Sequence, residues 1–362
     1  MKKYNKFEGK KKNILIIGAG IHGSFLALYL KKKFNSVNID IIDKNNSICS
    51  GTSASTHNRA NRGYHYPRSP KTSKECSKGW IYFKNNYGQF LKIIDSFYAV
   101  EKNSKTNPKK YEKFLKKNNL YYRIENSDYF NKKKISICFK AFEGCFNHEK
   151  IVRHFYKQFK KKKIKLINNF ELKKVSFSKN KKNIILFSSK KKTINKNYDI
   201  IFNSTYDNAN EILKKFKIKK LIKQKIQYTS IPVVESKKKI PGLTVMDGDY
   251  VTLMPYLGNK NKYLLYDCIN SISYKSHKNI ATMKNYYKIL KRFKEYYLLG
   301  KDFKFSKFLL GKRPIQIRDK NADRYTFVTK NQFNKIPLYS IYEGKYISAA
   351  YFTKKLVSKI KL

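Results

Sequence analysis

The sequence predicts an α/β fold, α+β overall, in which a parallel sheet is interleaved with an antiparallel sheet. The first observation is a strand, a glycine turn and a helix over residues 13–33, followed by a second strand that ends at Asp43. The second is the alternation of strand-like runs with Pro-Gly and Asp-Gly turns over residues 224–267. Because these two patterns do not belong to one sheet, we expect the chain to leave its first domain and return to it.

The glycine turn carries the most specific motif of the chain. Apolar residues 13–17 predict a strand, and the residues after the turn predict a helix. Gly18 permits the tight turn, Gly20 leaves room for a pyrophosphate, and Gly23 allows the helix to pack closely on the strand. The helix N-terminus favours phosphate, and Asp43, 20 residues after Gly23, can accept hydrogen bonds from ribose hydroxyls. The motif therefore predicts a bound dinucleotide.

Elements after Asp43 follow from hydrophobic periodicity and turn residues. Residues 44–70 are polar and have neither helical nor strand periodicity, and loops of this length in compact domains are usually functional. Strands expected over 172–177 and 183–187 form a small antiparallel hairpin. The other expected helices span residues 71–93, 148–162, 282–299 and 350–362, and the other expected strands span residues 96–101, 134–139, 163–167, 198–205, 228–234, 250–255, 263–267 and 346–349.

The formal net charge of +57 would suggest a nucleic acid or an anionic membrane as partner. However, nine of the 81 basic residues are arginines, which leaves 72 lysines, and Tyr and Phe are abundant at 29 and 25, as in proteins from AT-rich genomes. Nucleic-acid readers favour arginine, and none of their usual motifs occurs. We therefore expect a solvated lysine surface and no specific nucleic-acid partner, with weak binding of anions at low salt.

Arginine placement is more informative than arginine number. In a chain that uses lysine almost everywhere, arginine is expected where a planar group must bind carboxylate or phosphate or stack on a ring. Two short segments hold six of the nine arginines and are the expected walls of an active site: Arg59, Arg62 and Arg68 in one, Arg313, Arg318 and Arg324 in the other.

Cysteine and histidine positions predict neither disulfides nor a metal site. The five cysteines are odd in number, widely spaced and without a CxxC pair, which is typical of a reduced, cytoplasmic protein. His148 and His154 are six residues apart on one expected helix and lack an acidic partner, which does not suit a shared metal. Because there is no run of about 20 apolar residues and no apolar signal segment, we expect no membrane span.

These motifs resemble the FAD-dependent oxidoreductases of the D-amino-acid oxidase and glycine oxidase superfamily. The resemblance extends over most of the chain and includes the glycine turn with Asp43 and residues 50–55, 146–148, 201–205 and 311–314. Residues 63–69, 242–248 and 253–255 are similar to a bacterial subgroup often encoded beside surface-polysaccharide enzymes. The resemblance implies FAD as cofactor. It also implies a Rossmann-like, discontinuous FAD-binding domain (residues 1–70, 143–223 and 307–362) and a substrate domain (residues 71–142 and 224–306).

The resemblance also implies a set of cofactor-binding residues. The loop from Thr52 to Asn58 passes along the flavin, and Thr205 closes over the adenine and pyrophosphate. Relatives carry a glycine-rich turn before the last helix, where this chain has residues 344–349, so Lys345 is expected near the pyrimidine edge of the flavin. The full set is Gly18, Gly20, Ile21, His22, Gly23, Asp43, Lys44, Thr52, Ser53, Ser55, His57, Asn58, Thr205, Gly344 and Lys345.

Two residues are expected to act on the substrate. His65 is the candidate base, because an imidazole titrates near neutral pH, and its alternative is a histidine that only packs the loop. Arg313, in the family's GxRP pattern, faces a substrate carboxylate, and its alternative is a salt bridge to Asp319 or Asp323. His57 either contacts the flavin, even covalently, or is an ordinary loop histidine.

The expected activity is oxidation of a CH–NH or CH–OH group of a small anionic metabolite, such as an amino acid, a 2-hydroxy acid or a sugar derivative, with hydride transfer to flavin N5. Two alternatives remain. A tRNA-modifying flavoenzyme of the same superfamily would suit the basic surface, and a nicotinamide-dinucleotide-binding protein would explain the first motif alone. No residue pattern predicts the oligomeric state.

Overall fold

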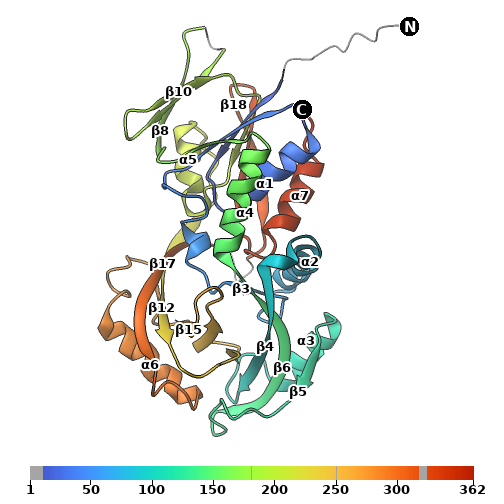
Figure 1. Ribbon diagram of the computed structural model, residues 1–362, viewed down its shortest axis with the longest axis vertical. Coiled ribbons are helices and arrows are strands. Elements are labelled where there is room, and N and C mark those ends of the chain that lie inside the picture. The colour runs from blue at the N-terminus through green and yellow to red at the C-terminus, as the bar shows by residue number, and fades with distance from the viewer. Residues whose placement is uncertain (1–10, 181, 250, 318–323) are drawn as a thin grey trace, which may run out of the picture.

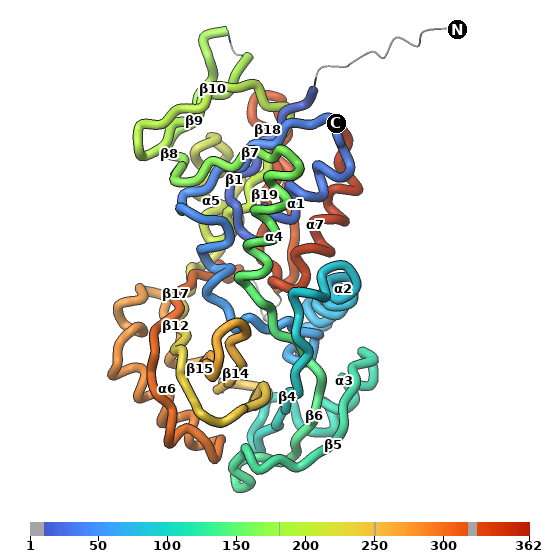
Figure 2. The backbone as a smooth tube through the Cα atoms, viewed as in Figure 1, coloured from blue at the N-terminus to red at the C-terminus, as the bar shows by residue number. Residues whose placement is uncertain are grey.

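The computed structural model describes residues 11–180, 182–249, 251–317 and 324–362. The molecule is elongated, with one sheet in the upper part of Figure 1 and a second sheet in the lower part. Figure 2 shows the chain starting in the upper part, passing down, returning, and passing down and back once more. The chain thus leaves the first sheet and returns to it twice.

The upper sheet has six strands, and its central strands are buried on both faces. Ile14 and Ile16 pack with the helices on one face, whereas Leu15 and Ile17 pack with a small sheet and α5 (Ala209–Lys215) on the other. A strand covered on both faces is typical of a parallel sheet. The strand order is β18 (Phe327–Phe333), β19 (Ile336–Tyr342), β11 (Ile200–Asn203), β1 (Asn13–Ile17), β2 (Asn38–Ile42) and β7 (Lys165–Ile167). All neighbouring pairs are parallel except β18 with β19, which is antiparallel.

Four helices lie on one face of this upper sheet, and α5 and a three-stranded sheet lie on the other. One face carries α1 (Ile21–Lys33), α2 (Pro70–Tyr87), α4 (His148–Lys161) and α7 (Ala349–Ser358), joined by an aromatic cluster around Phe25 and Phe83. On the other face lies the small sheet formed by β8 (Leu172–Phe177), β9 (Ile184–Ser188) and β10 (Thr193–Lys196).

The lower sheet has ten strands and is mostly antiparallel, with one parallel pair, β13 with β4. Phe293 and Ile289 of α6 (Met283–Tyr296) pack on Leu243 and Leu265 of this sheet. The path is β16 (Ile272–Ser273), β12 (Gln224–Glu235), β15 (Lys262–Asp267), β14 (Val251–Pro255), β13 (Gly242–Met246), β4 (Leu91–Glu101), β6 (Ile135–Phe146) and β3 (Arg59–Ala60), while β17 (Lys304–Gln316) pairs with β12 and β5 (Tyr122–Ile124) with β6.

Several element boundaries differ from the sequence prediction. The helix expected over residues 71–93 begins at Pro70 and ends at Tyr87, and residues 91–93 already belong to β4. The strand expected over residues 346–349 is wrong, because residues 346–348 form a turn and Ala349 is the first residue of α7. The expected hairpin is a three-stranded sheet, and the 44–70 loop contains a short 3₁₀ helix, Thr52–Ala54, and β3. Elements missed by the prediction are α3 (Pro108–Lys117), α5, β5, β10, β13, β16, β17, β18 and β19.

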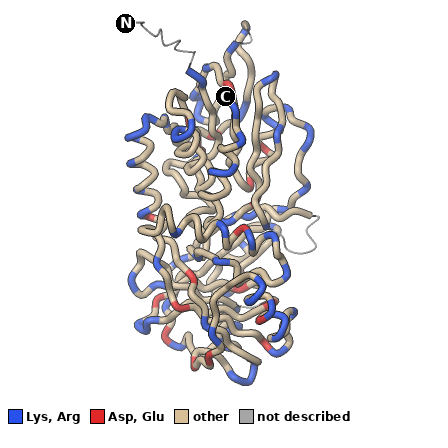
Figure 3. The backbone as a smooth tube through the Cα atoms, turned by 90° about the vertical axis from the view of Figure 1, so that its right-hand side faces the viewer, with Lys and Arg blue, Asp and Glu red and all other residues tan. Residues whose placement is uncertain are grey.

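Lysine and arginine residues occur over the whole length of the molecule (Figure 3). The acidic residues do not form an opposite face that would give the basic charge one direction. Among the described residues, no helix is both long enough and apolar enough to cross a lipid bilayer.

Candidate active site

The glycine turn connects the carboxyl end of β1 to α1 and permits very close packing. Gly18 has φ +99°, and a Cβ atom on it would lie 2.7 Å from the carbonyl oxygen of Ser204. A Cβ atom on Gly23 would lie 2.0 Å from the carbonyl oxygen of Gly18. At Gly20 the nearest atom to such a Cβ is the Ser53 hydroxyl oxygen at 3.7 Å, so the backbone there remains accessible. Gly20 is also the N-cap of α1 and has no side chain to cover the first N–H groups of the helix.

Asp43 follows β2 and holds this turn in place. Its carboxylate accepts hydrogen bonds from the backbone N–H of Ala19 at 2.7 Å and of Asn45 at 2.8 Å. Burial raises the pKa of Asp43 above its usual value, and the two backbone hydrogen bonds counteract part of that rise. The carboxylate therefore ties the end of β2 to the glycine turn, and its remaining lone pairs are available to a ligand.

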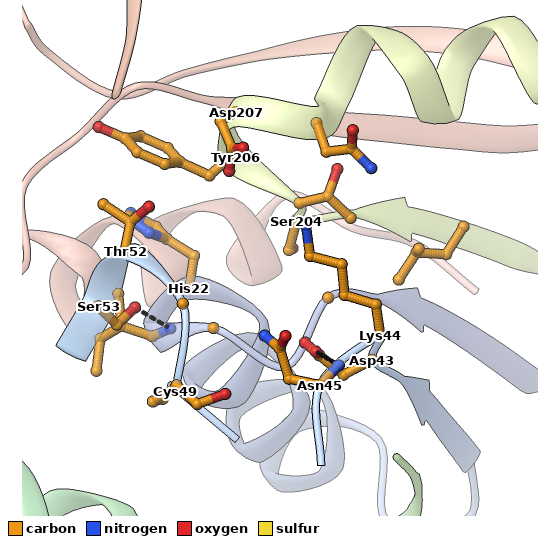
Figure 4. A pocket seen from close by; sticks show the side chains of 18 of the residues that line it. His22, Asp43, Lys44, Asn45, Cys49, Thr52, Ser53, Ser204, Tyr206 and Asp207 are labelled. Atoms are coloured by element: carbon orange, nitrogen blue, oxygen red, sulfur yellow. Dashed lines mark hydrogen bonds between the residues drawn. The ribbon is translucent and has the colours of Figure 1, made fainter. Parts of the chain in front are cut away.

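A first cavity, which we call the dinucleotide cavity, lies at the carboxyl ends of β1, β2 and β11 beside the N-terminus of α1. Figure 4 shows Asp43 and Lys44 near one end of it and His22, Thr52 and Tyr206 near the other. The carboxyl edge of a parallel sheet is the usual location of dinucleotide sites. Of the predicted cofactor residues, the lining includes Gly18, Gly20, Ile21, His22, Asp43, Lys44, Thr52, Ser53, Thr205, Gly344 and Lys345.

A second cavity, which we call the arginine cavity, has a volume of about 550 Å³ and lies between the upper sheet and the lower sheet. It meets the dinucleotide cavity at a junction, defined by the residues that line both: Thr52, Thr56, Tyr206, Gly344, Lys345 and Tyr346. Its other lining residues include Ser55, His57, Arg59, His65, Arg68, Asp247, Tyr266, Arg313 and Arg324.

Four of the six arginines singled out in the sequence line this cavity. Two of them have clear carboxylate partners: Arg59 lies 3.2 Å from the buried carboxylate of Glu143, and Arg68 lies 2.6 Å from Asp247. Arg324 is farther from its partner, at 3.8 Å from Glu343. Arg62 is the exception among the described arginines of the two segments, because its guanidinium stacks on Trp80 at 4.6 Å and does not line the cavity.

Arg313 differs from these arginines because no carboxylate of the described residues pairs with it. Its Nη2 donates to the Tyr266 hydroxyl at 2.5 Å, while its buried Nε has no hydrogen-bond partner. Arg318, Asp319 and Asp323, named in the sequence prediction, lie outside the described residues. Within the described chain, the Arg313 guanidinium thus retains binding capacity for an anion in the cavity.

Three histidines lie around the junction, and burial lowers the pKa of each. His65 has a buried Nδ1 without a partner, and its pKa is about 3. His57 lies edge-on to the Tyr266 ring at 4.5 Å, with its pKa held well below the usual range by burial and by Arg59 and Arg313. Burial lowers the pKa of His22, at the start of α1, to about 4. All three imidazoles are therefore neutral near pH 7.

Two predicted cofactor residues lie outside both cavities. Gly23 packs against the glycine turn, and Asn58 is buried with φ +50°, its carbonyl accepting from the Phe146 N–H at 2.7 Å. Sequence reasoning missed Tyr206 and Tyr266. Tyr206 directly follows the predicted Thr205 and could have been included on that ground, but only the strand register places Tyr266 beside Arg313. No group of three or more His, Cys, Asp or Glu side chains that could hold a metal ion occurs in the described segments.

A Rossmann-like sheet whose dinucleotide cavity opens into a second cavity lined by arginine and histidine defines a dinucleotide-dependent oxidoreductase. The sequence matches the family described as FAD dependent oxidoreductase over residues 13–319. The chain therefore belongs to the FAD-dependent oxidoreductase family, and its cofactor is FAD. No curated protein sequence matches the chain.

Solved structures agree on the fold. Glycine oxidase from Geobacillus kaustophilus superposes with a TM-score of 0.74 at 10% identity, covering 96% of this chain and 94% of that one. FAD-bound L-α-glycerophosphate oxidase from Mycoplasma pneumoniae gives 0.73 at 13% identity, covering 97% and 94%. L-Proline dehydrogenase from P. horikoshii gives 0.72 at 16% identity, with the same coverage of 97% and 94%. The predicted fold class and flavoenzyme family are thus confirmed.

Proposed function

We propose that this FAD-dependent oxidoreductase oxidises a small anionic metabolite by removing a hydride from a CH–NH or CH–OH group. The observation that carries the proposal is the Arg313 guanidinium, which lines the arginine cavity without a carboxylate partner among the described residues. A charged hydrogen bond to such a guanidinium contributes about 1.5–3 kcal/mol. Neighbours of the same fold include enzymes for glycine, L-proline and L-α-glycerophosphate, which supports an anionic substrate.

The residues of the two cavities fit FAD. We place the adenosine at Asp43, the diphosphate at the N-terminus of α1 beside Gly20 and Ser53, and the flavin ring at the junction. Bound there, FAD supplies the hydride acceptor. The six strands of the upper sheet all fall within residues 1–70, 143–223 and 307–362, which supports the proposed FAD-binding domain. However, β3 and most of β17, within the same ranges, belong to the lower sheet, and α2 of the proposed substrate domain packs on the helices of the upper sheet.

Arg313 and Tyr266 bind the anionic group of the substrate in this proposal. Arg324, which lines the same cavity, adds positive potential. His65 accepts a proton only weakly, because its pKa is about 3. A substrate amine that is already neutral needs little help from a base, so we favour CH–NH over CH–OH oxidation and an amino acid over a 2-hydroxy acid.

Changing His65 to glutamine separates these substrate classes. We expect kcat to fall by less than tenfold with an amino acid, but by about 100-fold or more with a 2-hydroxy acid, for which a positioned base contributes about 10²–10⁴. Because the pKa of His65 is about 3, the wild-type profile of kcat/KM should show no loss from protonation of His65 as the pH falls from about 8 to about 5. An acid limb near the usual histidine pKa that disappears in His65→Gln would contradict this assignment.

The proposed function is tested by anaerobic reduction of the bound flavin. FAD-loaded protein is mixed with amino acids, 2-hydroxy acids and sugar acids, and bleaching of the flavin absorbance is followed for each. We expect reduction by carboxylate-bearing amines and none by the matching amides or decarboxylated amines, which lack the anionic group. Equal reduction by charged and uncharged partners of each pair would refute the requirement for an anion.

The alternatives from the sequence are weaker. Basic residues are distributed over the whole molecule, so no localised surface favours a tRNA substrate. Membership of the FAD-dependent family does not support the nicotinamide alternative. The cytoplasmic location stays a prediction.

A further inference from the structure

Lys345 occupies an unusual position for a lysine in this chain. It follows Gly344, which has φ +96°, in the turn between β19 and α7, and its half-buried side chain lines both cavities at the junction. Its ammonium nitrogen lies 4.9 Å from the centre of the Tyr66 ring. None of the ion pairs among the described residues involves Lys345. Most lysines of the chain, in contrast to Lys345, lie exposed on the surface.

The surroundings of Lys345 oppose its positive charge. Two guanidinium groups, Arg313 and Arg324, lie near it, and the nearby carboxylate of Glu343 is 3.8 Å from Arg324. The Glu75 carboxylate accepts hydrogen bonds from Thr326 and Ser348. The charged and titratable groups around Lys345 come from α2 (Glu75, Cys76), the loop after β3 (His65, Tyr66), β17 (Arg313), the segment before β18 (Arg324), the segment after β19 (Glu343), the loop after β11 (Tyr206) and α1 (His22).

This environment favours the neutral amine of Lys345 over the charged ammonium. Burial and the two guanidinium groups hold the pKa of Lys345 well below its usual range, and Cys76 and Glu343 offset only part of this. A negative charge at the junction would instead favour the protonated form of Lys345, because it would offset the repulsion from Arg313 and Arg324. Hydride transfer creates such a charge, since a flavin that gains two electrons and one hydrogen nucleus becomes an anion.

We propose that Lys345 contacts the flavin ring and takes up one proton when the flavin accepts the hydride. The substrate carbon loses its C–H bond with both electrons to the flavin, and the adjoining N–H or O–H bond gives up its proton as the C=N or C=O bond forms. One proton is thus released for each hydride transferred, and Lys345 holds it as an ammonium beside the reduced, anionic flavin. No oxidant other than FAD is needed. The proposal rests on the flavin position given above but not on the identity of the substrate.

The test is the pH dependence of the flavin midpoint potential in FAD-loaded protein, measured with a reference dye and no substrate. For a two-electron couple, each proton taken up shifts the potential by about 30 mV for a tenfold change in proton concentration. From about pH 7 to about pH 9, an ordinary lysine stays charged and contributes nothing to this slope. We expect a two-proton slope in the wild type and a one-proton slope in Lys345→Met.

Two further variants make the result specific. Lys345→Arg keeps a permanent charge, so it should show the one-proton slope while retaining a potential above that of Lys345→Met, by about 30 mV or more for a tenfold or larger stabilisation of the reduced flavin. Lys312→Met removes an exposed lysine that lines neither cavity and should leave the slope and the potential of the wild type unchanged.

Equal slopes in the wild type, Lys345→Met and Lys345→Arg would overturn the proposal. If Lys345→Met does not load FAD, the Lys345→Arg slope still decides, since a two-proton slope in that variant excludes titration of Lys345. A failed substrate panel with a two-proton wild-type slope would refute the proposed function alone, because the potential is measured without substrate.

Discussion

Replacing Arg313 by alanine is expected to raise the KM for the anionic substrate by about 10- to 100-fold. The change removes a charged hydrogen bond worth about 1.5–3 kcal/mol, and each 1.4 kcal/mol corresponds to a factor of ten. It also leaves the Tyr266 hydroxyl without the donor that now lies 2.5 Å away. Steady-state kinetics with the best amino acid from the reduction panel measures the effect.

The neighbouring residue offers a matched control for the loss of charge. Lys312 is exposed on the same strand, β17, and does not line the arginine cavity, so Lys312→Ala removes one positive charge without touching the proposed site. We expect its KM to equal that of the wild type. Arg313→Lys should be intermediate, because the ammonium keeps the charge but loses the planar pair of donors. A KM of Arg313→Ala equal to that of Lys312→Ala would remove Arg313 from the substrate site.

Replacing Gly23 by alanine is expected to weaken FAD binding by about 10- to 100-fold. The added methyl group would lie 2.0 Å from the carbonyl oxygen of Gly18, so α1 must move away from the turn that is expected to hold the diphosphate. Forcing an atom into a packed site typically costs about 1–3 kcal/mol, occasionally more, and here the obstacle is backbone, which cannot rotate away. Quenching of FAD fluorescence during titration of the FAD-free protein gives the Kd.

Gly88 is the control for a glycine-to-alanine change. It has right-handed helical geometry, with φ −57°, and no atom lies within 4 Å of the position that a Cβ would take. Gly88→Ala should therefore bind FAD as the wild type does. The assignment of Gly23 to close packing of the dinucleotide turn would fail if Gly23→Ala kept wild-type affinity for FAD.

The features that sequence predicted best are local in the chain. The glycine turn and Asp43 lie within about 30 residues of one another, and each has a conformational or hydrogen-bonding reason that acts over short distances. Arginine placement also predicted most of the arginine cavity, because a lysine-rich chain makes each arginine informative. Arg62 shows the limit of that argument, since its guanidinium stacks on Trp80, a ring that sequence spacing did not connect to it.

The features that sequence missed depend on distant pairing. Tyr266 reaches Arg313 because β15 and β17 both pair with β12, and no local pattern reports that register. The wrongly predicted strand at residues 346–349 has a different cause. The ring centres of Tyr346 and Phe146 lie 4.4 Å apart, and Ile347 is buried. The turn before α7 is therefore as apolar as a strand would be. Residues 91–93 were assigned to a helix because the aromatic spacing of α2 extends past Gly88 to Phe90.

The order of strands in the upper sheet sets when the cofactor can bind during synthesis. β1 lies between β2 and β11, and β11 pairs in turn with β19, so the sheet is completed only after residue 342 has been made. Gly344 and Lys345, which close the junction, follow directly. A chain still on the ribosome with only its first half made would carry the glycine turn without β11 and β19 beside it. Cofactor capture should therefore be a late, cooperative step of folding, limited by contacts between the two ends of the chain and not by the turn itself.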